Sequence, residues 1–471
     1  MARYSRRSVV QASAAGVAMT AVPFSKWLGE EAYAATRVRY NAYSTEGKKM
    51  LKKYAKAVAI MKQKAAGDAT GWTFQWYTHY VRGDSTKSAE VKKLPIDQRP
   101  LANDMWNTCQ NHAGQTTEDM FLPWHRMFVF YFERIVRGVL EDPDWTLPYW
   151  NYNDTNEAAL PPEFLNPANT SNPLWSKNRN SGPNSGQKLT GLNLDALKKT
   201  NYSSFCSTLD FGLHGDVHVG VGNRSGMGNV PWAANDPIFW LHHCNIDRLW
   251  ASWNAGGYTN PTSPSWTDQT FVFANARGNK VVADVGSFTA IGPLQYSYER
   301  LEPVTVTSFA SPLLSRALSG PPLLLTAPGP VDLHARPVTV ELEPPAGKAA
   351  FSLQQHVRRL ASPKRVFLVV GGLETKGAPG VVYNVYLDLK EGDRAAEARR
   401  VGEINFFAAD MPPGGREMKH KPGLVFDVTD IVKKDAAAGR LGETLAVTIS
   451  PVGTPAKDAQ PVVGEIAFIE E

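Results

Sequence analysis

The sequence predicts a mainly α-helical domain followed by an all-β domain, and three observations support that prediction. All thirteen tryptophans lie at or before Trp266, so the composition changes in the last third of the 471-residue chain. Apolar residues recur at helical spacing within residues 36–305, whereas apolar and polar residues alternate in residues 337–471. The intervening residues 306–336 hold five prolines and few charges, which is typical of a linker.

Residues 1–34 have the features of an export signal. A twin-arginine pattern at Arg6 and Arg7 precedes a mildly apolar run over Val9–Phe24, and an Ala-x-Ala cleavage site follows at Ala32–Ala34. The run is too short and too weakly hydrophobic to span a bilayer, and no other segment is apolar enough. We therefore expect export by the twin-arginine route to the periplasm or the extracellular space. A disordered basic tail is the alternative.

The charge of the chain does not favour nucleic acid or an anionic membrane as a partner. The formal net charge is +5, and about +3 without residues 1–34, and the basic residues are scattered along the sequence. Three cysteines are too few, and odd in number, for a disulfide framework. One disulfide and three free thiols are both compatible with the sequence.

Four helical stretches organise the first domain, and we expect them to form a four-helix bundle. The first covers residues 48–64 and carries no histidine, and the second ends near His79. The third follows Pro123, which suits the first turn of a helix. The fourth begins at Asp236–Pro237, where an N-cap residue precedes a proline. The third and fourth stretches carry apolar stripes at helical spacing.

Alternating runs separated by turn residues predict strands in the last domain. The clearest runs are residues 381–389, 445–449 and 463–468. Because strands of this kind bury one face each, we expect residues 337–471 to form a small β-sandwich.

Histidine is the most informative residue type in this chain. Seven of the ten histidines fall between His79 and His243, and six of these form two sets of three. The sets are His79, His112, His125 and His214, His218, His243. Neutral imidazole suits copper, zinc, iron and nickel, and none of the local contexts supplies a carboxylate ligand. Two all-imidazole sites disfavour a hydrolytic two-metal centre and favour a dicopper site that handles dioxygen.

The positions of the histidines on the expected helices agree with this interpretation. His214 and His218 are four residues apart, which on a helix places both imidazoles on one face. His125 and His243 lie on the apolar stripes of their helices and should point toward a common interior. A single histidine on such a stripe is usually a core residue, but six candidates in two sets favour metal ligands.

Two long motifs resemble the copper signatures of tyrosinases, catechol oxidases and molluscan haemocyanins. The first runs Phe121-Leu122-Pro123-Trp124-His125-Arg126-x-x-Val129-x-x-x-Glu133, and the second runs Asp236-Pro237-x-Phe239-Trp240-x-x-His243-x-x-x-Asp247. The Tyr296-x-Tyr298 pair is similar to the end of the catalytic domain in that family. The β-rich C-terminal part resembles the shielding domain of plant and some bacterial polyphenol oxidases.

The resemblance implies a dinuclear copper cofactor. It implies His79, His112 and His125 on one copper and His214, His218 and His243 on the other. The second histidine of the doublet is the ligand in the family, which leaves His242 a structural role. The loop after His112 is longer than in the family, and Cys109 either forms a thioether to His112 or stays a free thiol. Asp247 and Arg248 are expected to be hydrogen-bonding partners rather than catalytic groups.

The resemblance also implies an oxidase reaction. Ortho-diphenols would be oxidised to ortho-quinones with O2 reduced to water, and ortho-hydroxylation of monophenols would be an additional activity. Asp210 takes the position of an acid that holds a water for the monophenol step, with a cap or salt bridge as its alternative role. Gly215 stands where the family has a helpful asparagine, which argues against hydroxylation. Val230 replaces a bulky gate residue, so we expect access for larger phenols.

Two further activities fit the same site. One is ortho-aminophenol oxidation, and the other, of a different class, is reversible O2 binding as in haemocyanin. O2 and small phenols are the expected partners, and a copper chaperone is a further candidate. The resemblance also implies that the C-terminal domain acts as an intramolecular lid over the copper pocket, with added stability as its alternative role.

Overall fold

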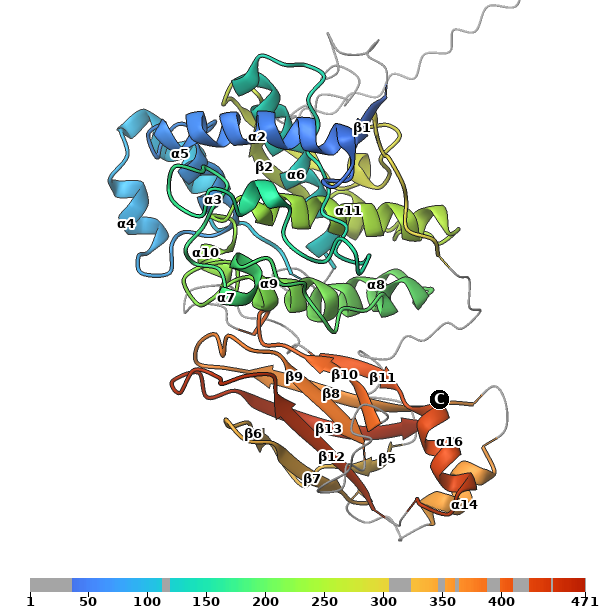
Figure 1. The fold of residues 1–471 in the computed structure, drawn as a ribbon. Coiled ribbons are helices and arrows are strands. Elements are labelled where there is room, and N and C mark those ends of the chain that lie inside the picture. The colour runs from blue at the N-terminus through green and yellow to red at the C-terminus, as the bar shows by residue number, and fades with distance from the viewer. Residues whose placement is uncertain are drawn as a thin grey trace, which may run out of the picture. The chain divides into compact units, whose positions relative to one another are not determined.

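The computed structural model describes residues 36–111, 119–304, 323–345, 352–360, 364–387, 399–409, 423–441 and 444–470. The predicted export signal at residues 1–34, the predicted ligand His112 and the first part of the predicted linker lie outside the described residues. Figure 1 shows helices over the first part of the chain and mainly strands over the last part. Among the described residues, no helix combines the length and the hydropathy needed to cross a membrane.

The first part of the described chain is mainly helical. Its α-helices are α2 (Thr45–Gln63), α3 (Trp72–His79), α4 (Lys87–Lys92), α5 (Arg99–Met105), α6 (Phe121–Leu140), α7 (Ser181–Asn184), α8 (Tyr202–Thr208), α9 (Gly215–Val221), α10 (Val230–Ala233), α11 (Ile238–Ala255) and α12 (Pro264–Thr267). A π-helical segment, η4 (Leu209–His214), leads into α9, and the 3-10 segments are η1 (Ile96–Gln98), η2 (Pro162–Phe164), η3 (Asp195–Lys198) and η5 (Gly286–Phe288). Strands β1 (Arg37–Arg39) and β4 (Tyr296–Tyr298) pair in parallel, and β2 (Thr270–Ala274) pairs with β3 (Lys280–Asp284) antiparallel.

The four helical stretches expected from the sequence are present as α2, α3, α6 and α11. Helix α6 begins at Phe121, which places Pro123 in its first turn, where the missing amide hydrogen costs no intrahelical bond. Helix α11 begins at Ile238 with Pro237 as its N-cap, one residue later than the predicted N-cap Asp236, and the Asp236 carboxylate accepts a hydrogen bond from the Ile238 amide at 3.1 Å. The same carboxylate binds Arg179 through two hydrogen bonds, so it fixes both the helix start and a neighbouring loop.

Helices α6 and α11 pack against each other through large aromatic side chains. Phe132 and Trp240 stack with ring centroids 3.4 Å apart and an interplanar angle of 11°, and both rings are fully buried. Aromatic pairs of this kind contribute about 0.5–1.5 kcal/mol beyond the burial of their surface. The predicted apolar stripes therefore face each other, and they carry His125 and His243 into the same interior.

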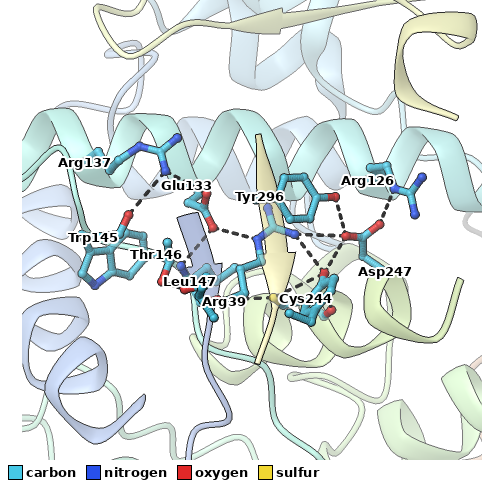
Figure 2. A network of polar contacts seen from close by, with 12 residues as sticks. Arg39, Arg126, Glu133, Arg137, Trp145, Thr146, Leu147, Cys244, Asp247 and Tyr296 are labelled. Carbon is cyan, nitrogen blue, oxygen red and sulfur yellow. Dashed lines mark hydrogen bonds and ion pairs between the residues drawn. The ribbon is translucent and has the colours of Figure 1, made fainter. Parts of the chain in front are cut away.

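A buried network of charged groups ties α6, α11, β1 and β4 together (Figure 2). Arg39 donates hydrogen bonds from Nε to Glu133 at 2.8 Å and from Nη1 to Asp247 at 3.0 Å. Asp247 also accepts from Arg126 and from the hydroxyl groups of both tyrosines of β4. Burial alone would raise the pKa of the Asp247 carboxyl, but Arg126 and Arg39 hold it below its ordinary value. The predicted hydrogen-bonding role of Asp247 is confirmed, because its buried charge is paired on several sides.

The last part of the described chain contains two sheets and two helices. The strands are β5 (Leu323–Thr326), β6 (Val331–Asp332), β7 (Val338–Leu342), β8 (Val366–Glu374), β9 (Tyr383–Leu387), β10 (Arg400–Ile404), β11 (Gly423–Asp427), β12 (Leu445–Pro451) and β13 (Val462–Glu470), and the helices are α14 (Leu353–Arg358) and α16 (Thr429–Ala437). The strand orders are β10-β9-β12-β7 and β11-β8-β13-β5, and β6 also pairs with β13. Buried side chains from both sheets share one hydrophobic core.

The predicted strand runs correspond to β9, β12 and β13, but two details of the prediction are wrong. The predicted linker extends to residue 336, whereas β5 and β6 already lie within residues 323–332. Strand β5 forms because β13 supplies its hydrogen-bonding partners, which the flanking prolines do not reveal. The domain is also not all-β, because α14 and α16 pack together at its edge and add apolar side chains to the core.

Candidate metal centre

Five of the six predicted ligands lie within the described residues, and every one of them is buried. His79 is the last residue of α3, His125 lies in the second turn of α6, and His214 ends η4. His218 lies in α9 and His243 in α11. All five side chains belong to residues that are no more than 4% exposed. The sixth predicted ligand, His112, is outside the described part of the chain, so its role stays a prediction.

The first group of donor atoms comes from α3, α6 and the residue Cys109. The donor atoms of His79, Cys109 and His125 lie within 4.8 Å of one another. The Cys109 sulfur is 3.7 Å from Nε2 of His125, and no disulfide joins any of the three cysteines, all of which lie within the described residues. For Cys109 the sequence leaves open a thioether to His112 or a free thiol, and its proximity to His125 was not among the expectations.

The second group of donor atoms comes from η4, α9 and α11. The donor atoms of His214, His218, His242 and His243 lie within 4.8 Å of one another. The Nε2 atoms of His218 and His243 are 3.4 Å apart. His242, which the sequence analysis assigns a structural role, therefore lies in the same group. Its Nδ1 atom is 3.0 Å from the hydroxyl group of Tyr152.

The two groups are adjacent. The rings of His125 and His243 stack with centroids 4.3 Å apart and an interplanar angle of 10°. The centroid of His125 lies 6.0 Å from that of His79 and 6.2 Å from that of His214. The packing of α6 against α11 thus brings two separate sets of imidazoles into one interior site.

Backbone carbonyl groups orient three of these imidazoles. Nδ1 of His125 donates to the carbonyl oxygen of Phe121 at 2.8 Å, and Nδ1 of His218 donates to that of Met227 at 2.8 Å. Nδ1 of His214 lies 3.1 Å from the carbonyl oxygen of Asp210. Because a carbonyl oxygen only accepts, each Nδ1 atom carries the proton and each Nε2 atom keeps its lone pair. This arrangement is typical of histidines that bind a metal.

Burial keeps the imidazoles of His79, His125, His218 and His243 neutral. Desolvation, together with the nearby His214, lowers the pKa of His79 to about 3. Desolvation also holds the pKa values of His125, His218 and His243 well below the ordinary value, with neighbouring histidines adding to the effect. Neutral imidazoles have lone pairs available for a metal at neutral pH.

The donor set fits a pair of copper ions. Neither group contains a carboxylate, and soft-to-intermediate nitrogen donors suit copper. Nδ1 of His79 and Nδ1 of His243 are buried without a hydrogen-bond partner among the described residues. Buried polar atoms of this kind require a partner that the side chains themselves do not supply, and a bound metal ion is one such partner.

The other three predicted site residues surround the histidines. Asp210 is 1% exposed, and its Oδ1 atom lies 2.9 Å from Nδ1 of His214. Val230 begins α10, and its backbone lies close to the ring of His79. Gly215 begins α9, and a Cβ atom at this position would lie only 2.2 Å from Oδ1 of Asn405. The space that a side chain at Gly215 would need is therefore filled by the C-terminal part of the chain.

Two residues that follow β10 reach the site, and no sequence pattern predicts either of them. Phe407 stacks on His218 with ring centroids 3.9 Å apart and an interplanar angle of 12°. Nδ2 of Asn405 donates to the carbonyl oxygen of Phe211 at 2.7 Å and to Asp216 at 2.9 Å. The adjacent aromatic residues Phe406 and Phe407 are the one local sequence feature that could indicate this contact, and such a pair is equally typical of a hydrophobic core.

Comparisons with known proteins match both parts of the chain. The family described as the common central domain of tyrosinase matches residues 69–196 and 176–256, and a domain of unknown function, DUF7868, matches residues 326–471. Tyrosinase HcTyr1 of Hahella sp. (strain CCB-MM4) is 28% identical over 92% of this chain and 99% of its own length. Polyphenol oxidase A1, chloroplastic, of Vicia faba is 27% identical over 56% of this chain and 47% of its own length.

Solved structures of similar fold include latent forms of plant enzymes. A latent aurone synthase (polyphenol oxidase) superposes with a TM-score of 0.61 at 18% identity and covers 93% of this chain and 90% of its own. A latent apple tyrosinase superposes with a TM-score of 0.59 at 21% identity and covers 93% of this chain and 98% of its own. At these identities the likeness concerns the fold, including the strands of the C-terminal part.

Proposed function

Because the chain belongs to the tyrosinase and polyphenol oxidase family and is a dicopper oxidoreductase of that family, we propose that it oxidises ortho-diphenols to ortho-quinones. Each diphenol gives up two electrons and two protons. The four electrons and four protons from two diphenols reduce one O2 to two waters. The observation that carries this proposal is the adjacency of two buried groups of imidazoles, which the packing of α6 against α11 brings together.

The ligand assignment follows from this adjacency. We propose that His79 and His125, with His112, hold one copper and that His214, His218 and His243 hold the other. The copper pair, when bound, supplies the two-electron redox chemistry that joins a diphenol to O2. The protein residues hold the imidazoles in place, since carbonyl groups fix the tautomers of His125, His214 and His218. His242 is left to bind Tyr152 beside the centre.

Three residues bear on whether the site also hydroxylates monophenols. Asp210 contacts His214, so its carboxylate is placed to orient that imidazole and to accept a proton close to the centre. Gly215 contributes no side chain, and Asn405 fills the adjacent space. Val230 is a small residue at the position proposed for the gate. We propose diphenol oxidation as the principal activity, with monophenol hydroxylation and ortho-aminophenol oxidation as secondary candidates.

The C-terminal part is proposed to form a β-sandwich lid that keeps the enzyme latent. Phe407 covers one face of the His218 ring, and Asn405 binds the backbone of η4 and the side chain of Asp216. An exposed ion pair between Arg224 and Asp458 joins the same two parts of the chain. Since an aromatic ring on a ligand face excludes a second aromatic ring, phenols would enter only after Phe407 withdraws.

Initial rates of O2 consumption with catechol and with tyrosine, on intact and linker-cleaved protein, test this function. The proposal predicts sustained consumption with catechol that rises after cleavage. Reversible O2 binding without consumption would instead favour a carrier such as haemocyanin. If tyrosine gives no rate even after cleavage, monophenol hydroxylation is removed from the proposal and diphenol oxidation stands.

The cellular location is proposed from the sequence alone. Arg6 and Arg7 form the twin-arginine pattern, so replacing both with lysine should retain the protein in the cytoplasm. Fractionation of cells expressing each version measures this, and unchanged export of the double variant would remove the proposal.

A further inference from the structure

A second cavity of about 550 Å³ lies in the helical part, away from the histidines. It is formed by the end of α11, the loop of residues 258–262 and the residues that follow η5. Its walls include Arg126, Ala251, Asn254, Tyr258, Asn260 and Ile291. None of the described histidines lines it, so it is not part of the metal centre. Its volume is within the range that small organic ligands occupy.

A buried guanidinium group with an unused donor forms part of this cavity. Arg126 is 1% exposed, and its Nε donates to Asp247 while its Nη1 donates to the carbonyl oxygen of Phe288 at 3.0 Å. Nη2 is buried and has no hydrogen-bond partner among the described residues. In Figure 2 the terminal nitrogens of Arg126 point away from Asp247. A buried donor on a charged group is costly to leave unpaired, so this atom indicates a missing acceptor.

The charge balance around Arg126 leads to the same conclusion. Among the described residues, its one carboxylate partner is Asp247, which also pairs with Arg39. The guanidinium carbon of Arg126 lies 3.6 Å from the centroid of the Trp250 ring, which fixes the plane of the group. A fixed planar cation that shares its only counter-ion is suited to a second carboxylate, because guanidinium and carboxylate match in geometry.

The remaining walls of the cavity offer one more free donor and an apolar surface. The hydroxyl group of Tyr258 is buried without a partner among the described residues. By contrast, Asn260 accepts from Trp250 at 2.9 Å and donates to the carbonyl oxygen of Thr289 at 2.9 Å, so it forms a fixed wall. Ala251 and Ile291 supply apolar contacts. The unpartnered buried groups of the cavity are therefore the Nη2 donor of Arg126 and the hydroxyl group of Tyr258, and both can donate a hydrogen bond to a carboxylate.

We propose that this cavity binds a small organic acid. Its carboxylate accepts hydrogen bonds from Nη2 of Arg126 and from the hydroxyl group of Tyr258, and its apolar body lies against Ala251 and Ile291. The ligand class follows from the two unused donors, the cationic group and the volume. The proposal does not depend on the oxidase activity, because it concerns a different set of residues.

Calorimetric titration of the copper-loaded full-length protein with cyclohexanecarboxylate tests the proposal. The matched neutral probe is cyclohexanecarboxamide, which has the same shape and lacks the charge. We expect the acid to bind about tenfold more tightly than the amide, since hydrogen bonds to charged groups are the stronger ones. Equal affinities, or no binding of the acid, would overturn the proposal.

Two glycine variants separate this cavity from the copper centre as the place of binding. A Cβ atom on Gly292, at the cavity edge, meets nothing within 4 Å, so Gly292→Trp is tolerated by the fold and obstructs the cavity. We expect it to weaken acid binding by about tenfold. Gly329→Trp is the control, because that glycine is equally unobstructed and lies in the C-terminal part. Unchanged affinity of the Gly292→Trp variant would show that the acid binds elsewhere, for example at copper, and would refute the proposal.

Tyr258→Phe gives a finer measurement at the same site. It removes the hydroxyl group and keeps the ring, so the cavity retains its shape. We expect the affinity for the acid to fall severalfold and the affinity for the amide to change less. An acid affinity that does not change would contradict the proposed role of Tyr258.

Discussion

The ring of Phe407 lies face to face on the ring of His218, with centroids 3.9 Å apart. These residues are nearly two hundred positions apart in the sequence, and one belongs to the β-rich part while the other is a proposed copper ligand. The contact therefore joins the two parts of the chain at the proposed centre. Because the proposed latency depends on contacts made by individual side chains, single substitutions can test it.

Phe407→Ala should activate the intact enzyme. Removing the ring exposes one face of His218 and weakens the contact between the two parts, so the open state becomes more populated. We expect the catechol oxidation rate of uncleaved protein to rise by about tenfold if the ring contributes about 1.4 kcal/mol to closure. Phe426→Ala is the control, because Phe426 is a partly buried ring of the same part of the chain, packed against its core. Equal rates for the wild type and Phe407→Ala would remove Phe407 from the lid.

Gly215→Asn should have a similar effect by a different route. The Cβ atom would lie 2.2 Å from Oδ1 of Asn405, so the Asn405 side chain must move and give up its hydrogen bonds to Phe211 and Asp216. We expect a higher catechol oxidation rate of the intact chain and faster proteolysis in the linker. Gly292→Asn, at an unobstructed position, serves as the control. If Gly215→Asn leaves both the rate and the proteolysis unchanged, Asn405 does not hold the lid in place.

Glu133→Gln should destabilise the helical part. The carboxylate pairs with Arg39 and Arg137 in a buried network, and removing its charge takes an anionic partner from both and leaves Asp247 to balance both Arg39 and Arg126. Breaking a buried ion pair in this way costs about 3–5 kcal/mol. Urea unfolding followed by tryptophan fluorescence measures this, since all tryptophans lie at or before Trp266. Glu46→Gln, which breaks an exposed pair with Lys49, should change the unfolding free energy by less than about 0.5 kcal/mol.

The C-terminal part should lose stability in acid through Glu470. Burial raises the pKa of this carboxyl, but hydrogen bonds from Lys364 and His356 outweigh burial and leave the pKa below the ordinary value of 4.5. The folded state is thus favoured when the carboxyl is ionised. This stability is complete above about pH 4.5 and is lost as the pH falls through the lowered pKa.

Far-UV circular dichroism during acid titration measures this effect. The Glu470→Gln variant should unfold with a weaker dependence on pH below pH 4.5 than the wild type. An identical pH dependence in the two proteins would show that Glu470 contributes nothing to the acid sensitivity.

Local sequence patterns predict the helices and the histidine positions that depend on spacing. The apolar stripes of α6 and α11 predict that His125 and His243 face one interior, and their rings are stacked there. The alternating runs likewise predict β9, β12 and β13, because the period of a half-buried strand is visible in the residues themselves. Features that depend on ten or twenty consecutive residues, such as these helices and strands, can therefore be predicted from the sequence.

Contacts between residues that are distant in the sequence cannot be predicted in this way. Strand β5 depends on β13, more than a hundred residues later, so its segment resembles a linker until its partner is known. The proximity of Cys109 to His125 and of Phe407 to His218 depends on how whole helices and loops pack, and no spacing rule encodes it. His242 and His243 differ by one position on the same helix, and packing alone brings both into the second group of donors.

Copper content per chain in His243→Gln and His242→Gln, beside the wild type, tests the central claim most directly. The account predicts two coppers in the wild type and in His242→Gln, and loss of at least one copper in His243→Gln, measured by atomic absorption on folded protein. Two coppers retained in His243→Gln, or no copper in the wild type after loading, would contradict the assignment of a dicopper centre to these histidines.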